Sequence, residues 1–352
     1  MIALILILFS SISFSQDFGN GSDGVCNFTG GVQAKSVWNC TDLFVSNTNT
    51  FPAATAVILK VSGSVSIAGG GVLSVTGKGM SGGTCSATPC SSPQTDASNP
   101  SGVTAAGGNA ATDGGFAASG GGGSGATHAT AGGNGNIGND GGSGTPGAGG
   151  VASLAGYGSE SNFATVMNAG SGGGAGGNGD DAGTLLSGGV GGAGGGIIKI
   201  FSKGSVDVNG SIISNGAIGS NGVTNVSAGG GGGGGGSGGS IFIYSQSTVS
   251  VTGSMQALGG SGGSGFAGAG AGGSGGAGRI RVDSFDGTVV GSVNINPAPE
   301  IFTAAALPSL KAKFKSDIAH NCSFKSEQVD FYPSFIFGIL LSLFAMVILR
   351  RI

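Results

Sequence analysis

Charged side chains are scarce in this sequence. Asp, Glu, Lys and Arg make up 8% of its 352 residues, and the formal net charge is -3. Nucleic-acid-binding proteins need clustered Lys and Arg to neutralise phosphates. The 13 basic residues form no such stripe, so nucleic-acid binding is not expected.

Histidine is rarer still, with His128 and His320 as the only two. Neither has sequence neighbours that would orient it against a nucleophilic serine or a carboxylate. The pattern GxGxxG recurs, but no copy follows a predicted strand and opens a helix, as phosphate binding requires. The sequence therefore predicts a protein that is not an enzyme and that binds no cofactor.

Aromatic residues are also few, at 7%, and Trp38 is the only tryptophan. Glycine, in contrast, occurs 81 times. Because glycine loses more backbone entropy on folding than any other residue, long glycine tracts are either disordered or held by close backbone packing. A large conventional hydrophobic core is not expected.

One unit is written twice at a spacing of 43 residues, within residues 191–265. The copies read GGAGGGIIKIFSKGSVDVNGSIISNG and GGSGGSIFIYSQSTVSVTGSMQALGG, and they align Ile198 and Ile200 with Ile241 and Ile243. Apolar residues two apart, divided by small turn residues, predict short β-strands. Repetition at a fixed period predicts stacked units that bury each other's apolar faces.

Two further partial copies extend this repeat. The segment GSVSIAGGGVLSVTG at 63–77 is a diverged first copy, and GGAGRIRVDSFDGTVVGSVNI at 275–295 is a third copy with its spacing shortened to 39. Short alternating runs upstream predict strands around Val37, at 43–45 and at 56–61, whereas the stretch from Asp17 is predicted to be loop-like. The N-terminal part would then cap the open end of the stack.

The glycine-rich region at 80–190 has two readings, which the sequence leaves open. One is disorder, because too little apolar surface is present to offset the ordering entropy. The other is a bundle of polyglycine II helices, with three residues per turn and closely packed backbones. GGSGGSG at 259–265 and GGSGGAG at 272–278 keep a three-residue period, which favours the bundle near the repeats.

Both ends of the chain are hydrophobic. Residues 1–15 are apolar or small, as in a secretory signal peptide. The run from Phe331 to Leu349 has 19 uncharged residues, enough at about 1.5 Å per residue to cross most of a bilayer core. Arg350 and Arg351 follow, so by the positive-inside rule the tail is cytoplasmic and the rest of the chain is exported. An uncleaved N-terminal anchor and a buried C-terminal helix are the alternatives.

The predicted organisation has six parts. They are a signal peptide at 1–15, an N-terminal β segment or cap at 16–79, a glycine-rich low-complexity region at 80–190, a β repeat region at 191–296, a stalk at 297–330 and a transmembrane anchor at 331–352.

The five cysteines agree with export, because disulfides persist in oxidising compartments. Short spacing favours the pairs Cys26 with Cys40 and Cys85 with Cys90, although four cysteines permit three pairings. Neither a CxxC spacing nor a nearby histidine supports a metal site. Cys322 is then left over as a free thiol, an intermolecular link or a partner that displaces one of the local pairs.

One acidic pair, Asp180 and Asp181, lies in GGNGDDAGTLL, which is similar to the calcium-binding nonapeptide of β-roll toxins. Gly183 stands where that motif has an apolar residue, and no tandem copy follows. Calcium needs several oxygen ligands that converge, so the pair is a weak calcium candidate and no metal site is expected.

On these features, residues 17–300 resemble glycine-rich, repeat-containing bacterial cell-surface proteins of the β-helix or polyglycine type. The C-terminal hydrophobic run and its two arginines resemble the sorting tails of bacterial surface proteins, although no LPxTG or Pro-Glu-Pro sequence precedes them. The resemblance implies an all-β fold. Its core would be a parallel β-helix or β-roll of stacked repeats, with polyglycine II-like or disordered glycine-rich segments and one C-terminal transmembrane helix.

The function implied by this resemblance is that of a non-enzymatic, membrane-anchored protein of the cell surface, either a structural coat component or an adhesin. It would cross the membrane once, with its N-terminal region exported. Its partners would be the membrane together with cell-wall polymer, surface glycans or other surface proteins.

A ligand-binding ectodomain is an alternative function, either receptor-like or an ice-binding polyglycine bundle. It would need a flat regular face or an aromatic pocket. Trp38, Phe242 and Tyr244 are too few and too far apart in the sequence to form such a pocket.

A polysaccharide-acting β-helix enzyme is the second alternative. Such enzymes use clustered Asp, Arg or Lys on one strand face, and Arg279, Arg281 and Asp283 come nearest to this arrangement. We interpret these three residues as a solvated outer face, which is the usual role of alternating charges on a strand.

Overall fold

The computed structural model describes residues 17–52, 56–85, 118–139, 145–153, 156–163, 166–181, 183–225, 228–286, 288–291 and 294–303. All of them belong to the first of two compact units, Met1–Ala306. The signal peptide predicted at 1–15 and the anchor predicted at 331–352 lie outside the described residues. Among the residues described, no helix has the length and apolar character that a membrane crossing requires.

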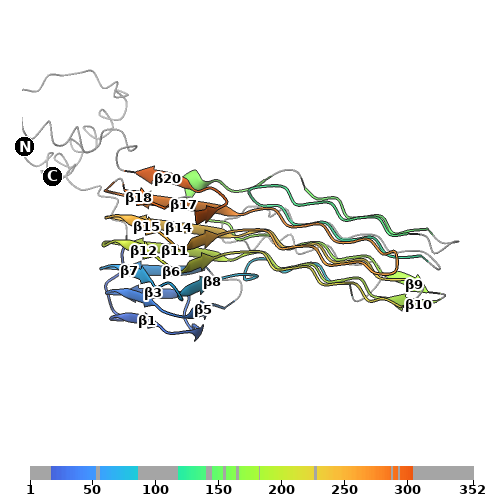
Figure 1. The fold of residues 1–352 in the computed structure, drawn as a ribbon, viewed down its shortest axis with the longest axis horizontal. Helices are drawn as coiled ribbons and strands as arrows, with labels where there is room; N and C mark the ends of the chain where they lie inside the picture. Colours follow the sequence, from blue (N-terminus) through green and yellow to red (C-terminus); the bar gives the residue numbers. More distant parts are fainter. Residues whose placement is uncertain are drawn as a thin grey trace, which may run out of the picture. The chain divides into compact units, whose positions relative to one another are not determined.

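The strands form three parallel sheets, which the chain visits in turn (Figure 1). The first sheet contains β1 (Cys26–Phe28), β4 (Leu43–Val45), β7 (Val65–Ile67), β12 (Val206–Val208), β15 (Val249–Val251) and β18 (Val289–Val290). The second contains β2 (Gly31–Val32), β5 (Thr48–Thr50), β8 (Val72–Ser74), β13 (Ser211–Ile213), β16 (Ser254–Gln256) and β19 (Ile295–Asn296). The third contains β3 (Val37–Cys40), β6 (Ala56–Val61), β11 (Ile197–Ser202), β14 (Ser240–Ser245), β17 (Arg279–Ser284) and β20 (Glu300–Thr303). Each circuit adds one strand to every sheet, which is the topology of a parallel β-helix.

The sequence repeat sets the register of these sheets. Ile198 of β11 lies beside Ile241 of β14, 43 residues later, and Ile241 lies beside Ile280 of β17. The diverged first copy is also in register, because Val65 of β7 pairs with Val206 of β12. The predicted parallel stacking of the copies is therefore confirmed. The loop-like interpretation of the N-terminal stretch is wrong where β1 and β2 begin, and β20 adds a strand within the range predicted to be the stalk.

A circuit of the β-helix is much shorter than the 43-residue period. Cys26 pairs with Leu43, 17 residues later, and Leu43 pairs with Val65, 22 residues later. The longer circuits each carry a glycine-rich insertion at the same corner, between a strand of the second sheet and the next strand of the third sheet. The repeat therefore combines one β-helix circuit with one glycine hairpin.

The β-helix interior is filled by stacked aliphatic side chains. Leu59, Ile200, Ile243 and Val282 occupy equivalent positions on β6, β11, β14 and β17, and none has measurable exposure. Full burial of one such side chain contributes about 1.5–3 kcal/mol. Because each circuit supplies only a few of these residues, one circuit alone could not offset its ordering entropy, and stacking is required.

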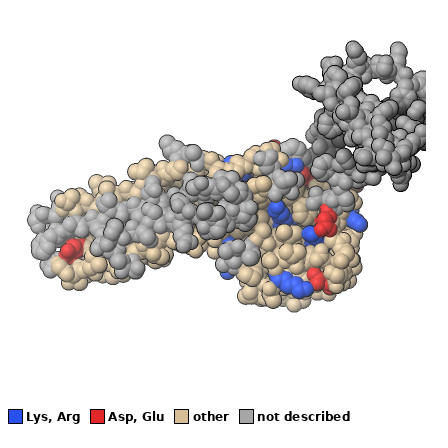
Figure 2. All heavy atoms as spheres, turned by 180° about the vertical axis from the view of Figure 1, so that it is seen from behind, with Lys and Arg blue, Asp and Glu red and all other residues tan. Residues whose placement is uncertain are grey.

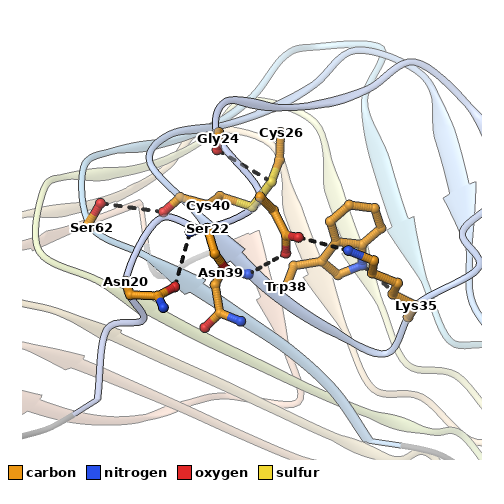
Figure 3. The surroundings of a disulfide bond; sticks show 10 residues. Asn20, Ser22, Gly24, Cys26, Lys35, Trp38, Asn39, Cys40 and Ser62 are labelled. Carbon is orange, nitrogen blue, oxygen red and sulfur yellow. Dashed lines mark hydrogen bonds and ion pairs between the residues drawn. A yellow bond between two sulfur atoms is a disulfide. The ribbon is translucent and has the colours of Figure 1, made fainter.

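A disulfide closes the N-terminal end of the stack (Figure 3). Cys26 of β1 and Cys40 of β3 are bonded, with their Cα atoms 5.6 Å apart, which confirms this predicted pair. The ring of Trp38 lies 5.0 Å from that of Phe28, edge to face, and covers the end of the core. Cys85 is disulfide-bonded, while Cys90 and Cys322 lie outside the described residues. The Cys85–Cys90 pair therefore stays a prediction.

The insertions run side by side as extended glycine segments, which we call the glycine bundle (Figure 1). The described part of the bundle comprises residues 79–85, 118–139, 145–152, 169–181, 183–196, 214–225, 228–239 and 257–278. Its segments exchange backbone hydrogen bonds at every third residue, as in Gly120 to Gly229, Gly123 to Gly232 and Ala126 to Gly235. This pattern is the one expected for polyglycine II, and it confirms the bundle reading for the described residues.

Segment 229–239 is the centre of the bundle. Its backbone is hydrogen-bonded to six neighbouring segments, at 118–127, 169–178, 187–196, 214–222, 257–265 and 269–278. A Cβ atom added to Gly233, Gly234 or Gly235 would lie 2.1, 1.9 or 2.0 Å from a carbonyl oxygen of three different neighbours. No side chain fits in any direction here, which explains the unbroken run of glycines from 229 to 236.

Segments at the edge of the bundle have fewer neighbours and tolerate side chains. In segment 257–265, Leu258, Ser261 and Ser264 occur at every third position and are partly or fully exposed. Gly259 and Gly260 face neighbouring segments, where a Cβ atom would lie 2.0 Å from a carbonyl oxygen. The three-residue period of the sequence therefore indicates a glycine segment with one side facing solvent.

Candidate binding tip of the glycine bundle

The far end of the bundle is the only place where the described bundle residues carry charge. Lys and Arg gather over the β-helix, and a single acidic spot marks the opposite end of the bundle (Figure 2). The described bundle contains no Lys or Arg, and its only acidic residues are Asp180 and Asp181. Between these regions, the described bundle residues offer no charged side chain to a ligand.

Four turns meet at this end, and we call them the tip. They comprise residues 137–139, the hairpin of β9 (Gly179–Asp181) and β10 (Thr184–Leu186), residues 223–225 and residues 265–269. Hydrogen bonds join these turns either directly or through the residues that flank them. Asp180 N donates to Ala118 O beside the first turn, Asn225 Nδ2 donates to Asp181 Oδ2, Gly222 N donates to Ser264 O, and Asn139 N donates to Gly268 O. The turns thus form one continuous surface.

Two of these turns use left-handed backbone conformations. Gly183 has φ +91° and donates its N–H to Asp180 Oδ1 at 2.6 Å, which closes the β9–β10 hairpin. Ala267 has φ +50° and is followed by Gly268 at φ +81°. Ala267 is the only residue other than glycine with a positive φ in the described part of the chain. A side chain in this region costs about 1–2 kcal/mol, and such strain is often found at functional turns.

Each turn of the tip also exposes one large apolar side chain. The exposed fractions are 65% for Ile137, 53% for Leu185, 55% for Val223 and 46% for Phe266. Leu185 lies directly across the hairpin from Asp180. Val151, Val190 and Ile218 are exposed along the sides of the bundle, but they lie on separate segments and not on a shared turn surface. The tip is therefore an apolar surface with an acidic part.

The predicted calcium pair lies in this tip and has other roles. Asp180 Oδ1 accepts the Gly183 N–H, and Asp181 Oδ2 accepts a hydrogen bond of 2.5 Å from Asn225. In the described part of the chain, no group of three or more His, Cys, Asp or Glu residues is placed to hold a metal ion. Each carboxylate uses one oxygen to hold a turn, so these residues shape the tip.

The charged residues of β17 form a second cluster, on the outer face of the third sheet. Arg279 Nη1 donates to both carboxylate oxygens of Glu160, at 2.8 and 2.7 Å. Glu160 belongs to η1 (Glu160–Asn162), the only helical turn in the described residues. Arg281 Nε and Nη2 donate to the two oxygens of Asp283, both at 2.7 Å. Arg281 Nη1 also donates to the backbone oxygens of Glu160 and Ser161.

The sequence interpretation of these residues as a solvated face is wrong for Arg281 and Asp283, which are 9% and 8% exposed. The segment around η1 covers them, and burial raises the pKa of the Asp283 carboxyl although Arg281 opposes the shift. Sequence reasoning missed this because Glu160 is 119 residues from Arg279. The cluster fastens the covering segment to the sheet, since its polar groups are paired with one another.

The aromatic residues considered for a pocket are divided between two places. Phe242 packs edge to face with Phe163 and Phe201 under the covering segment, and the Arg281 guanidinium lies 5.5 Å from the Phe242 ring centre. Tyr244 packs at the border of this cluster, and burial raises its pKa. Trp38 lies at the N-terminal end of the other core cluster. The expectation that the three residues are separate is confirmed for Trp38 but not for Phe242 and Tyr244.

His128 is fully buried where the bundle joins the β-helix. Its Nδ1 lies 2.6 Å from Gly238 O, and its ring stacks on that of Tyr157 with the ring centres 4.5 Å apart. Nε2 has no hydrogen-bond partner, and burial lowers the pKa of His128 to about 4. A neutral ring with Nδ1–H donating to Gly238 fits these surroundings. His320 lies outside the described residues.

No protein family, curated protein or solved structure compared with this chain matches it.

Proposed function

We propose that this chain is a non-enzymatic adhesin of the cell surface, in which the β-helix carries the glycine bundle and the bundle presents the tip to a partner. The observation that carries the proposal is the placement of four exposed apolar side chains on four bonded turns at the end of a neutral bundle. Exposed apolar side chains gathered on one surface commonly mark interaction sites. Binding residues also concentrate on loops held by a rigid scaffold.

The bundle is suited to hold such a surface away from the β-helix. Segment 229–239 has 11 residues, which at about 3.1 Å per residue spans roughly 34 Å. Its six hydrogen-bonded neighbours resist bending, because any bend would stretch bonds on several sides at once. A rigid support lowers the entropy that binding must offset.

Exposure outside the cell is part of the same proposal. The Cys26–Cys40 disulfide is favoured by an oxidising compartment. The sequence-predicted signal peptide and the single membrane span from Phe331 to Leu349, followed by Arg350 and Arg351, would export the protein and hold it at the membrane. Deletion of residues 331–352 should release the protein into the medium, and retention on cells would contradict the anchor.

The adhesive role is tested by substitution at the tip. Cells that display the full chain are compared for attachment with cells that display Phe266→Ser or Leu185→Ser. Each change should reduce attachment roughly tenfold, because loss of one exposed anchor side chain typically costs 1–2 kcal/mol of binding. Ile218→Ser is the matched control, since Ile218 is 69% exposed but lies away from the tip turns. Equal loss in all three variants would contradict the role of the tip.

The ice-binding alternative has one observation in its favour. Segment 269–278 contacts four neighbours, so in hexagonal packing the segments 257–265, 269–278 and 130–139 lie along one straight edge of the bundle. This edge presents small neutral residues at every third position, namely Ser261, Ser264, Ala271, Ser274 and Ala277. An ice-binding protein would show thermal hysteresis that Ser274→Lys removes, whereas the adhesin would show none.

The enzyme alternative is less favoured by the contacts of its candidate residues. Arg279, Arg281 and Asp283 are committed to Glu160, to the backbone and to each other. If the protein is an adhesin, the full chain should not cleave polysaccharide. Polysaccharide cleavage by the full chain that is lost in the Arg281→Ala variant would overturn the proposal.

A further inference from the structure

The acidic and apolar side chains of the tip indicate the class of partner that the tip binds. The inference about this partner rests on the proposed adhesive function. Leu185 and Asp180 are direct cross-strand neighbours in the β9–β10 hairpin. Side chains at such positions lie about 5 Å apart, so an acidic group adjoins the apolar surface. Asp181 is joined through Asn225 to the turn that carries Val223. Acidic and apolar groups are therefore interleaved.

The charge of the tip is not balanced nearby. No Lys or Arg occurs in the described bundle. The Asp180 carboxylate accepts a hydrogen bond from a backbone N–H, and the Asp181 carboxylate accepts one from a neutral amide. The bundle spans roughly 34 Å, several times the Debye length of about 8 Å at physiological ionic strength. The lysines and arginines of the β-helix thus cannot neutralise the tip.

We propose that the tip binds a basic protein surface. In this complex, Lys or Arg side chains of the partner pair with Asp180 and Asp181, while apolar side chains of the partner pack on Leu185, Val223 and Phe266. An anionic membrane surface suits the apolar residues but is repelled by the two carboxylates. A basic protein satisfies both features, because opposite charges steer the encounter and the apolar centre excludes water.

The inference is tested with the purified full chain and defined probes. The first probe is an immobilised amphipathic helical peptide made of Lys and Leu, and the second has Glu in place of every Lys. The expected result is binding to the Lys peptide only, weakened by added salt. The pair Asp180→Asn with Asp181→Asn should reduce binding at least tenfold, and Phe266→Ser should reduce it similarly. Asn keeps a side-chain oxygen for each turn, so the tip should remain folded.

Controls separate the tip from the overall charge. The pair Asp207→Asn with Asp286→Asn removes the same charge from the β-helix and should bind the Lys peptide as the unchanged chain does. Equal loss in both double variants would overturn the inference, because binding would then follow net charge. The circular dichroism spectrum and melting temperature of each variant show whether folding is intact. The pair Asp180→Glu with Asp181→Glu keeps both negative charges and should bind the Lys peptide, unlike the Asn pair.

Other outcomes also decide the matter. Equal binding to the Lys and Glu peptides would overturn the inference. So would binding to phosphatidylcholine vesicles containing phosphatidylserine without binding to the Lys peptide, since the tip would then be a membrane contact. If Phe266→Ser still abolishes cell attachment while the Lys peptide does not bind, the adhesive function stands and only the partner class is wrong.

Discussion

The glycines at 229–236 are enclosed by backbone of the neighbouring segments, so a single methyl group should be costly there. Gly234→Ala is the sharpest case. Its Cβ atom would lie 1.9 Å from Ser124 O, whereas ordinary van der Waals contact begins at 3.4 Å. Segment 118–127 and segment 229–239 would have to separate by most of this difference. Movement in the opposite direction is blocked, because Gly233 and Gly235 meet carbonyl oxygens of other neighbours.

The magnitude follows from the bonds that such a shift disturbs. Gly234 N donates to Gly174 O, and Gly192 N donates to Gly234 O, both at 2.8 Å. Weakening two buried hydrogen bonds costs about 2 kcal/mol, and overpacking costs about 1–3 kcal/mol. The lower entropy of unfolded alanine returns about 0.4–1 kcal/mol. We therefore expect Gly234→Ala to lower the free energy of unfolding by about 3 kcal/mol.

The assay is urea unfolding at pH 7 combined with amide hydrogen exchange. Gly234→Ala should also speed the exchange of the two amides that donate these bonds, at position 234 and at Gly192. Gly133→Ala is the matched control, because Gly133 belongs to the same bundle but its Cβ atom would be 3.3 Å from Ser274 N. The control should change the free energy of unfolding by less than about 0.5 kcal/mol. Equal stability of the two variants would refute the close-packed arrangement.

Three further predictions concern other parts of the molecule. For His128, the folded state holds the pKa near 4 by burial, below its ordinary value of 6.5, so the unfolded chain binds more protons between these values. The free energy of unfolding should therefore fall by about 3 kcal/mol as the pH drops from 6.5 to 4. In urea unfolding across this range, His128→Asn should lack this pH dependence. An unchanged pH dependence in the variant would show that another group causes it. Ala267→Gly should raise stability by about 0.5–1 kcal/mol in calorimetry, because glycine adopts the left-handed turn without strain, and a lower melting temperature would show that the turn is not strained. Replacing both Cys26 and Cys40 by Ser should lower the free energy of unfolding by about 3 kcal/mol in urea, because their disulfide closes a loop with a sequence separation of 14. No loss of stability would mean that the unfolded chain is already constrained without the disulfide.

Local patterns in the sequence were sufficient to predict the β-helix. Strand positions in sheets of this kind depend on alternating apolar residues and on stacking of equivalent positions, so the 43-residue repeat predicted the pairing of Ile198 with Ile241. The short separation of Cys26 and Cys40 predicted their disulfide. Polyglycine II has three residues per turn, so the three-residue period of the glycine segments predicted this conformation directly from the sequence.

The tip could not be predicted in this way. Asp180 and Leu185 lie in one hairpin, but Asn139 and Gly268 meet from turns that are far apart in the sequence. Neighbouring glycine segments recognise each other through backbone groups, which are the same at every residue, so the sequence does not specify which segments pair. That choice depends on where the β-helix places the start of each insertion.

The residues themselves thus determined a stacked β scaffold with glycine segments and one local disulfide, because alternation, repetition and cysteine spacing are local properties. Only the tertiary structure decided which segment is enclosed, which residues cover β17 and which apolar side chains share the tip. The physical reason is that a glycine hydrogen bond carries no side-chain identity, and Glu160 reaches Arg279 only after the chain has folded back over the third sheet.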